Sequence, residues 1–388
     1  MKIALLSEKY TPDIGGLAIS AGRLARLLTS AGHEIRVYCP SPSLSPSETR
    51  TLPSNGVSIT RFGAHKRVDD TLVDWFELIV EEHRHDPFDV LHAYFLTQAG
   101  FTATYAGKYL NIPSVVSIRG NDIERAAFDP GKFSHVMYAL QNASAVTTNA
   151  SELVKKAKAF VDREIYLIPI GIDTDHFKPL DVDSGGLPPS FREQVLGTGA
   201  SSRLQNPVLG FIGELREKKG LKTLLAAYAQ VNKKHPACLL IVGEVRQGED
   251  NQIFDEFRSS NPDSQIFVTG YISPADLPAY YSLIDIFIHP SLRDGMPNAV
   301  LEAMACERAV LATPVGGVVD VLEDGVNGMF VPVNNADRLA QKINEMLEDP
   351  ALRSRLGAGA RQTIMHHFTT TGELEGNLSV YRTLGLIP

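Results

Sequence analysis

The sequence predicts two α/β domains, each a doubly wound parallel sheet with helices on both faces. Three observations support this fold class. The chain has 388 residues, which is too many for one hydrophobic core. Short, continuous apolar runs recur with helix-length polar segments between them, and such runs indicate strands covered on both faces. This alternation of apolar runs and polar segments is absent from residues 178–206 and resumes after them.

The first domain is predicted to span residues 1–177. Its strands are expected at residues 3–6, 35–39, 90–92, 114–118, 145–148 and 165–168. Because helix-length segments separate these runs, the strands should be parallel and joined by crossover helices.

Residues 178–206 are rich in Gly, Pro and Ser, which indicates a linker. The second domain is predicted at residues 207–365, with strands at 208–212, 239–242, 266–268, 284–289 and 310–312. Residues 366–388 have a helical pattern, and a tail of this length is expected to pack back on the first domain. Since ligands bind at the carboxyl ends of parallel strands, the expected site is a cleft between the domains.

The formal net charge of −8 argues against a nucleic-acid binder, which needs a basic face. The three cysteines lack metal-ligand spacing, so buried thiols in a reducing cytosol are expected. Neither a signal peptide nor a long apolar segment is visible, which predicts a cytoplasmic protein. Residues 151–160 combine three lysines with apolar residues. This segment fits a helix in peripheral contact with the inner face of a membrane, and equally an ordinary surface helix.

Two adjacent glycines, Gly15 and Gly16, follow the first predicted strand and precede a predicted helix. Glycines let the backbone approach a diphosphate, whose charge is favoured at a helix N-terminus. A loop that needs positive φ explains the pair equally well. The segment is not a GxGxxG turn, which counts against a nicotinamide or flavin site.

A loop bounded by Gly213 and Gly220 follows the strand at 208–212 and carries Arg216 and Lys219. Cations at the carboxyl end of a strand can neutralise a diphosphate as it leaves. A solvated helix start is the alternative explanation of this charge run.

The segment 291–305 contains two carboxylates, Asp294 and Glu302. Pro297 predicts that a loop ends and a helix begins there, which presents backbone N–H groups to an anion. Glu302 lies about 7 Å along that helix from Pro297, so the two carboxylates could hold hydroxyls at different points of one ligand. Apolar neighbours make a carboxylate at 302 costly unless it is partnered, and an internal salt bridge is the alternative explanation.

The pattern S-x-x-D-G-x-P-x-x-x-x-E-A-M-A over this segment resembles the acid-x7-Glu signature of family 4 retaining glycosyltransferases. The resemblance spans nearly the whole chain. The supporting matches are Gly15-Gly16, Asp89-Val90-Leu91-His92, Arg119-Gly120-Asn121-Asp122, Pro169-Ile170-Gly171-Ile172-Asp173, Lys219-Gly220, Thr313-Pro314-Val315-Gly316-Gly317 and Asn327-Gly328. The resemblance implies a GT-B fold, in which two Rossmann-like domains face a central cleft.

The resemblance also implies roles for single residues. Glu302 would accept hydrogen bonds from the donor ribose, and Asp294 would hold the transferred sugar. The further donor contacts it implies are Gly16, Arg216, Lys219, Ile272, Gly295, Met296, Pro297 and Asn298. The catalytic candidates are Arg119, Asp122, Arg216, Lys219 and Asp294, and the acceptor candidates are His92 and Asn121. His289 is expected to be a packing residue at a strand end. The family transfers sugar with retention of configuration and without a bound metal or other cofactor.

The chain departs from the family pattern at three positions. Asp294 stands where the first acid is commonly Glu, Arg119 where His often precedes Gly, and Glu214 where Arg often follows the loop glycine. The predicted function is transfer of a hexose from a nucleotide-diphosphate sugar, with UDP-glucose first, to a glycan or lipid-linked acceptor in polysaccharide biosynthesis. A non-catalytic nucleotide-sugar binder and a GT-B epimerase or phosphorylase remain as alternatives.

Overall fold

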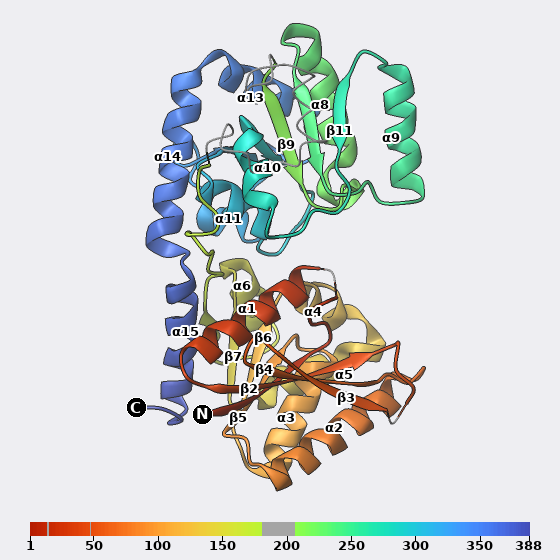
Figure 1. Cartoon of the computed structure of the whole chain (residues 1–388), viewed down its shortest axis with the longest axis vertical. Helices are drawn as coiled ribbons and strands as arrows, with labels where there is room; N and C mark the ends of the chain where they lie inside the picture. The colour runs from red at the N-terminus through yellow and green to blue at the C-terminus, as the bar shows by residue number, and fades with distance from the viewer. Residues whose placement is uncertain (14, 47, 181–205) are drawn as a thin grey trace. The chain divides into compact units, whose positions relative to one another are not determined.

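The computed structural model describes residues 1–13, 15–46, 48–180 and 206–388 and shows two compact α/β domains (Figure 1). The first comprises Met1–Ile170 together with Thr370–Pro388, and the second comprises Gly171–Thr369. Residues 171–177, which the sequence places with the first domain, group with the second. Most of the predicted linker, residues 181–205, lies outside the described residues.

The described part of the first domain contains an eight-stranded sheet in the order β3-β4-β2-β1-β5-β6-β7-β8. Its strands are β1 (Lys2–Ser7), β2 (Glu34–Ser41), β3 (Thr49–Ser54), β4 (Val57–Gly63), β5 (Val90–Tyr94), β6 (Ser114–Ile118), β7 (Ala145–Thr148) and β8 (Tyr166–Leu167). Its helices are α1 (Gly16–Ser30), α2 (Val68–His85), α3 (Gln98–Leu110), α4 (Asn121–Glu124), η1 (Ala126–Phe128), α5 (Pro130–Asn142), α6 (Ser151–Lys158) and α15 (Thr370–Thr383). All neighbouring strands pair in parallel except β3 with β4.

The predicted strands omit the β3–β4 hairpin of the first domain. Its turn residues, Asn55 and Gly56, have φ values of 50° and 78°. An Asn-Gly pair readily supplies the positive φ angles of a tight hairpin turn, and this signal was overlooked. Strand β3 is exposed along its whole length, so it carries no apolar run by which to recognise it.

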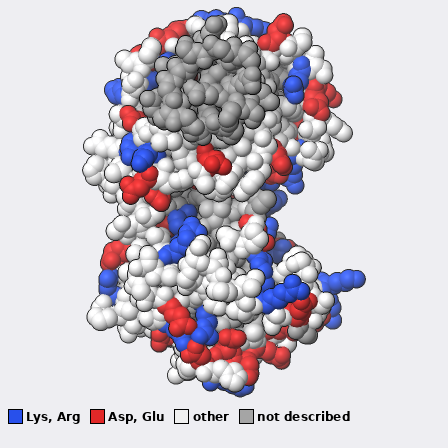
Figure 2. All heavy atoms as spheres, viewed as in Figure 1, with Lys and Arg blue, Asp and Glu red and all other residues white. Residues whose placement is uncertain are grey.

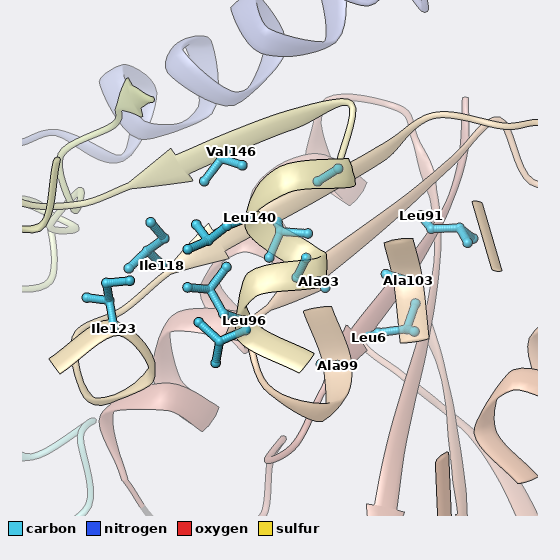
Figure 3. Close-up of a cluster of buried hydrophobic side chains, with 14 of the residues drawn as sticks. Leu6, Leu91, Ala93, Leu96, Ala99, Ala103, Ile118, Ile123, Leu140 and Val146 are labelled. Atoms are coloured by element: carbon cyan, nitrogen blue, oxygen red, sulfur yellow. The ribbon is translucent and has the colours of Figure 1, made fainter. Parts of the chain in front are cut away.

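Alternate residues of each strand point to opposite faces of the first sheet, and both faces are covered. On one face, Leu91 and Ala93 of β5 pack with Ala99 of α3 in a large apolar cluster (Figure 3). On the other face, Val90 and Tyr94 of the same strand pack in a cluster that includes residues of α1 and α15. Coverage on both faces is the physical reason for the continuous apolar runs.

Helix α15 packs on the first domain beside α1 (Figure 1). Arg23 of α1 donates from Nε to Glu373 Oε2 at 2.6 Å, and both side chains are largely buried. The Tyr381 hydroxyl lies 2.7 Å from His92 Nδ1. Residues 370–388 therefore complete the interior of the first domain.

The described part of the second domain contains a six-stranded parallel sheet in the order β11-β10-β9-β12-β13-β14. Its strands are β9 (Val208–Ile212), β10 (Cys238–Val242), β11 (Gln265–Val268), β12 (Ile286–His289), β13 (Ala309–Ala312) and β14 (Met329–Phe330). Its helices are η3 (Glu217–Lys219), α8 (Leu221–Lys234), α9 (Glu249–Ser260), α10 (Leu277–Leu283), α11 (Asn298–Ala305), α12 (Val318–Val321), α13 (Ala336–Glu348) and α14 (Pro350–His367).

Acidic and basic side chains are interspersed over the drawn face of both domains (Figure 2). In α6, Leu153 and Ala157 belong to the core of the first domain, and Lys156 forms ion pairs with Glu124 at 2.5 Å and Glu152 at 2.6 Å. Part of the apolar side that suggested a lipid-facing helix thus packs on the domain itself. In the described ranges, no helix combines the length and apolar character needed to cross a membrane.

Candidate active site

In the second domain, β9 and β12 are neighbours, so the loops that follow their carboxyl ends lie together. The loop after β9 carries Arg216 and Lys219, and the loop after β12 carries Asp294 and leads into α11. A hydrogen bond of 3.0 Å from Leu292 N to Lys218 O joins the two loops. The fold thereby brings the predicted diphosphate loop to the predicted carboxylate.

Asp294 is the centre of this arrangement. Its Oδ2 accepts hydrogen bonds from Lys219 Nζ, in an ion pair, and from His289 Nε2 at 3.1 Å. Its Oδ1 accepts the Gly295 N–H at 3.0 Å, and Ser291 Oγ lies 3.5 Å from Oδ2. The carboxylate is therefore fixed by groups from two loops and from the end of β12.

The surroundings of Asp294 favour its ionised form. Burial alone would raise the pKa of Asp294, but the hydrogen bond from His289 and the charge of Lys219 lower that pKa well below its usual range. Burial lowers the pKa of His289, although its hydrogen bond to Asp294 opposes this shift. At neutral pH a neutral imidazole therefore donates from Nε2 to a carboxylate.

Arg216, the other predicted diphosphate ligand, pairs with Glu214 at 3.0 Å between Nη1 and Oε2. The loop thus carries an internal ion pair at the position where the resembled family often has an arginine. Lys218 adds a third cation. Burial lowers the pKa of Lys218, and repulsion from Lys219 and Arg216 adds to this effect against the attraction of Asp294. Three cations against the two glutamates Glu214 and Glu217 leave this loop with a net charge of +1, which favours an anion.

Two glycines permit the close approach of the loops around Asp294. Gly220 has a φ of 82°, and a Cβ there would lie 2.1 Å from the Pro290 carbonyl oxygen. Gly316 has a φ of 57°, and a Cβ there would lie 2.0 Å from the Asp294 carbonyl oxygen. The next residue donates its N–H to Gly295 O at 2.6 Å. The adjacent glycines after β13 therefore seat that loop against the Asp294 loop.

Glu302 lies in α11, where a buried tyrosine of α10 contacts it. The Tyr281 hydroxyl donates to Glu302 Oε2 at 2.8 Å and lies 3.2 Å from Ala299 O. Burial and the charge of Glu302 raise the pKa of Tyr281 well above its usual value, so the phenol remains a donor. The carboxylate is thus tolerated among apolar neighbours because one oxygen is satisfied from inside the domain.

The remaining predicted donor contacts also follow strands of the second sheet. Pro297 is the N-cap of α11, and Asn298 is the first helical residue. Met296 packs on Gly317, where an added Cβ would lie 2.6 Å from its side chain. Ile272 is half-buried in the loop after β11. Because β10 and β9 separate β11 from β12, Ile272 follows the strand at the edge of the sheet rather than a neighbour of β12.

In the first domain, Gly15 is the N-cap of α1 with a φ of 131°, and Gly16 is the first helical residue. A Cβ at Gly16 would meet nothing within 4 Å, so Gly16 leaves space in front of the helix N-terminus. The backbone angle requires glycine at position 15. Asn121, an acceptor candidate, is exposed at the start of α4.

Asp122 is fully buried, and its side chain forms hydrogen bonds with the backbone. Its carboxylate accepts the N–H groups of Leu96, Arg119, Gly120 and Ile123 at 2.8–3.2 Å. Burial raises the pKa of Asp122 to about 6, although these N–H groups favour its ionised form. Asp122 therefore ties the loop after β6 to the loop after β5 and fixes the backbone of Arg119. The direct catalytic role of Asp122 stays a prediction.

His92 was expected at a strand end, but β5 continues to Tyr94, which pairs with Ser7. His92 is therefore in the middle of the strand and fully buried, 3.0 Å from Ser117 Oγ and in contact with α15. The expectation of a strand-end side chain at the site was wrong because the apolar run extends past the histidine. Arg119 lies at the carboxyl end of β6, with its guanidinium carbon 4.0 Å from the Tyr94 ring centre.

Two residues of the site were missed by the sequence prediction. His289 was assigned to packing, yet it contacts Asp294, and its place at a strand's carboxyl end just before the acidic loop was the available signal. No sequence pattern links Tyr281 to Glu302, because the two residues are 21 positions apart in the chain and come together only in the folded domain.

Comparisons with known proteins agree with this arrangement. Residues 14–176 match the family described as Glycosyltransferase Family 4, and residues 200–363 match Glycosyl transferases group 1. A D-inositol 3-phosphate glycosyltransferase of Pseudarthrobacter chlorophenolicus is 24% identical over 92% of this chain and 90% of its own length.

Solved structures of two proteins share the whole fold. Sucrose-phosphate synthase from Thermosynechococcus elongatus has a TM-score of 0.81 at 22% identity and covers 99% of this chain and 98% of its own. HepE of Anabaena in complex with UDP has a TM-score of 0.81 at 20% identity over 100% of both chains, and its complex with UDP-glucose has 0.78 at 19% over 100% of both. The predicted GT-B fold is confirmed.

Proposed function

Because this chain belongs to the glycosyltransferases, with a family 4 N-terminal region and a group 1 C-terminal region, we propose that it is a retaining hexosyltransferase. The proposed donor is a UDP-sugar, with UDP-glucose first, and the proposed acceptor is a glycan or lipid-linked sugar in polysaccharide biosynthesis. The ion pair of Lys219 with Asp294, beside the helix that carries Glu302, is the observation that carries the donor site. HepE, which shares the fold, has been solved with UDP and with UDP-glucose, which supports testing this donor first.

In the proposed reaction, the bond between the anomeric carbon and the diphosphate breaks and an oxocarbenium-like centre forms. Negative charge grows on the diphosphate oxygens as they depart. Lys219 and Arg216 stabilise that charge from fixed positions, which lowers the barrier. Glu302, held by Tyr281, accepts the ribose hydroxyls, and Asp294 holds the transferred sugar and the Lys219 ammonium.

The acceptor oxygen attacks on the face from which the diphosphate leaves, and a diphosphate oxygen takes the acceptor proton. The new bond therefore keeps the anomeric configuration of the donor. In this scheme, protein cations provide the charge stabilisation, so we propose that turnover needs no bound metal.

Donor binding tests the site. Calorimetry with UDP, UDP-glucose and GDP-glucose is performed on the wild type, on Glu302→Ala and on Glu256→Ala, which alters an exposed glutamate of α9. Glu302→Ala is expected to weaken UDP-glucose binding at least about tenfold, because hydrogen bonds to a charged group are lost. Glu256→Ala should bind like the wild type. Equal binding by all three proteins, or no nucleotide-sugar binding by the wild type, contradicts the proposed site.

Turnover tests the reaction. With UDP-glucose and a panel of glycan acceptors, UDP release should depend on acceptor, and NMR of the product should show the donor's anomeric configuration. Chelation with EDTA should leave the rate unchanged. Binding without acceptor-dependent release would favour the non-catalytic alternative, and sugar isomerisation without transfer would favour an epimerase.

A further inference from the structure

Arg119 differs from the other half-buried arginines that the structure describes. Each of the others has a carboxylate or carbonyl oxygen as partner: Arg23, Arg36, Arg61, Arg163, Arg216, Arg308, Arg353 and Arg361. For Arg119, no such oxygen is found among the described residues. Its Nε is also buried without a hydrogen-bond partner, a feature that it shares with Arg163 and Arg216.

A partly dehydrated guanidinium without a counter-ion is costly, because the charge loses water and gains no anionic partner. The surrounding structure nevertheless holds Arg119 in place. Asp122 binds its backbone N–H, and the ring of Tyr94 lies 4.0 Å from the guanidinium carbon. Contact with an aromatic face offsets part of the cost, while the donors in the guanidinium plane remain suited to an anion that accepts two parallel hydrogen bonds.

The carboxyl ends of three adjacent strands surround Arg119. Tyr94 ends β5, Arg119 follows β6, and Thr148 ends β7 in register with Ile118. Thr148 Oγ1 and Asn149 Oδ1 are also buried with no hydrogen-bond partner in the part of the chain that the structure describes. Unpartnered polar atoms at the carboxyl edge of a parallel sheet are the expected lining of a ligand site.

We propose that Arg119 binds an anionic group, a carboxylate or a phosphate, carried by one of the two sugar substrates. This inference rests on the proposed transferase function and narrows its substrate class. The planar fork of arginine matches either anion through two parallel hydrogen bonds, which a neutral hydroxyl cannot accept. The anion belongs either to the acceptor, as in a sugar phosphate, or to the donor, as in a UDP-hexuronic acid.

The test uses the intact protein and substrate pairs that differ in the acidic group. The pairs are glucose 6-phosphate against glucose, glucuronic acid against glucose, and UDP-glucuronic acid against UDP-glucose. Calorimetry compares the wild type with Arg119→Gln and Arg119→Lys. Arg125→Gln serves as control, because Arg125 is an exposed arginine of the same segment.

In at least one pair, the acidic member should bind the wild type and Arg125→Gln roughly 10- to 100-fold more tightly than the neutral member. Arg119→Gln should bring that ratio to about one, and Arg119→Lys should retain part of it. A preference in the UDP pair assigns the anion to the donor, and a preference in a free-sugar pair assigns it to the acceptor.

A second measurement does not depend on the choice of sugar. Inorganic phosphate should slow the modification of Arg119 by phenylglyoxal, read by mass spectrometry, and should leave Arg125 unprotected. If UDP binds with dependence on Glu302 but no pair shows a preference and phosphate gives no protection, the anion site is overturned while the transferase function stands. If UDP fails to bind and phosphate still protects Arg119, the anion site stands and the transferase function falls.

Discussion

At Glu302, one buried hydroxyl holds one oxygen of the carboxylate. Tyr281→Phe removes that hydroxyl while the ring stays in the core, so the carboxylate loses one anchor. Binding of UDP should weaken about tenfold, in keeping with the loss of one hydrogen bond to a charged group at about 1.5 kcal/mol. The wild-type preference for UDP over 2′-deoxy-UDP should also shrink, which calorimetry with both nucleotides measures.

The matched control for Tyr281→Phe is Tyr228→Phe, which removes another buried hydroxyl of the same domain, bonded to Ala237 O at 3.0 Å. Both variants should lose stability, but only Tyr281→Phe should change the ratio between the two nucleotides. An unchanged ratio would show that Tyr281 packs in the core but does not position Glu302 for the ribose.

His92 should make the first domain less stable as pH falls. Burial lowers the pKa of His92 to about 3, and the charge of Arg119 adds to this shift. An unfolded histidine titrates near 6.5. Between these values the unfolded chain binds a proton that the native state excludes. The free energy of unfolding therefore falls by up to about 1.4 kcal/mol for each pH unit below about 6.5.

His92→Gln removes this contribution, so its stability deficit relative to the wild type should narrow between pH 7 and pH 5. Urea unfolding at several pH values measures the deficit. His367→Gln, which alters an exposed histidine, should follow the wild-type profile. If the free energy of unfolding changed equally with pH in His92→Gln and in the wild type, the folded protein would bind a proton at His92 as readily as the unfolded chain. That result would contradict the prediction.

At the scale of elements, the loop after β13 depends on Gly316. Gly316→Ala would place a Cβ in a left-handed conformation and 2.0 Å from the Asp294 carbonyl oxygen, so the Asp294 loop must move. Gly325→Ala meets the same backbone restriction at a φ of 74°, with no neighbour within 4 Å. Both should lose roughly 1 kcal/mol of stability or more. Only Gly316→Ala should also weaken UDP-glucose binding, and equal binding by the two variants would contradict this role.

Strands that are buried along their whole length were predictable from the sequence, while the exposed strand β3 and its partly buried partner β4 were not. The predicted bounds of β6, β7 and β9 coincide with the observed bounds, because burial on both faces leaves a continuous apolar run. The exposed strand β3 and the two-residue strand β14 carry no such run, whereas the two-residue strand β8 lies inside the predicted strand at residues 165–168.

The candidate site follows the same division. Lys219, Asp294 and Glu302 were predicted because each lies in a local motif with a recognisable spacing, and the structure brings Lys219 and Asp294 into contact. The hydrogen bonds from Tyr281 and His289, and the backbone role of Asp122, depend on which elements meet in three dimensions. Spacing along the chain does not encode those contacts.

At the scale of the whole molecule, the first domain requires a segment that follows the second domain in sequence. Truncation after Thr369 removes Glu373 from Arg23 and Tyr381 from His92, and it uncovers the apolar face that α15 covers. Hydrogen exchange should therefore show loss of protection in the first domain with protection of the second domain retained. Equal protection in the truncated and full-length chains would show that α15 is dispensable.

This order of segments also determines when each part of the first domain is synthesised. A ribosome that has finished residues 1–170 must still translate all of Gly171–Thr369 before α15 emerges. At about 5–20 residues per second, that interval lasts roughly 10–40 s. During this time the nascent first domain has its central strands but lacks the helix that covers one face, so it presents an apolar surface to chaperones. The first domain to leave the ribosome is the last to be completed.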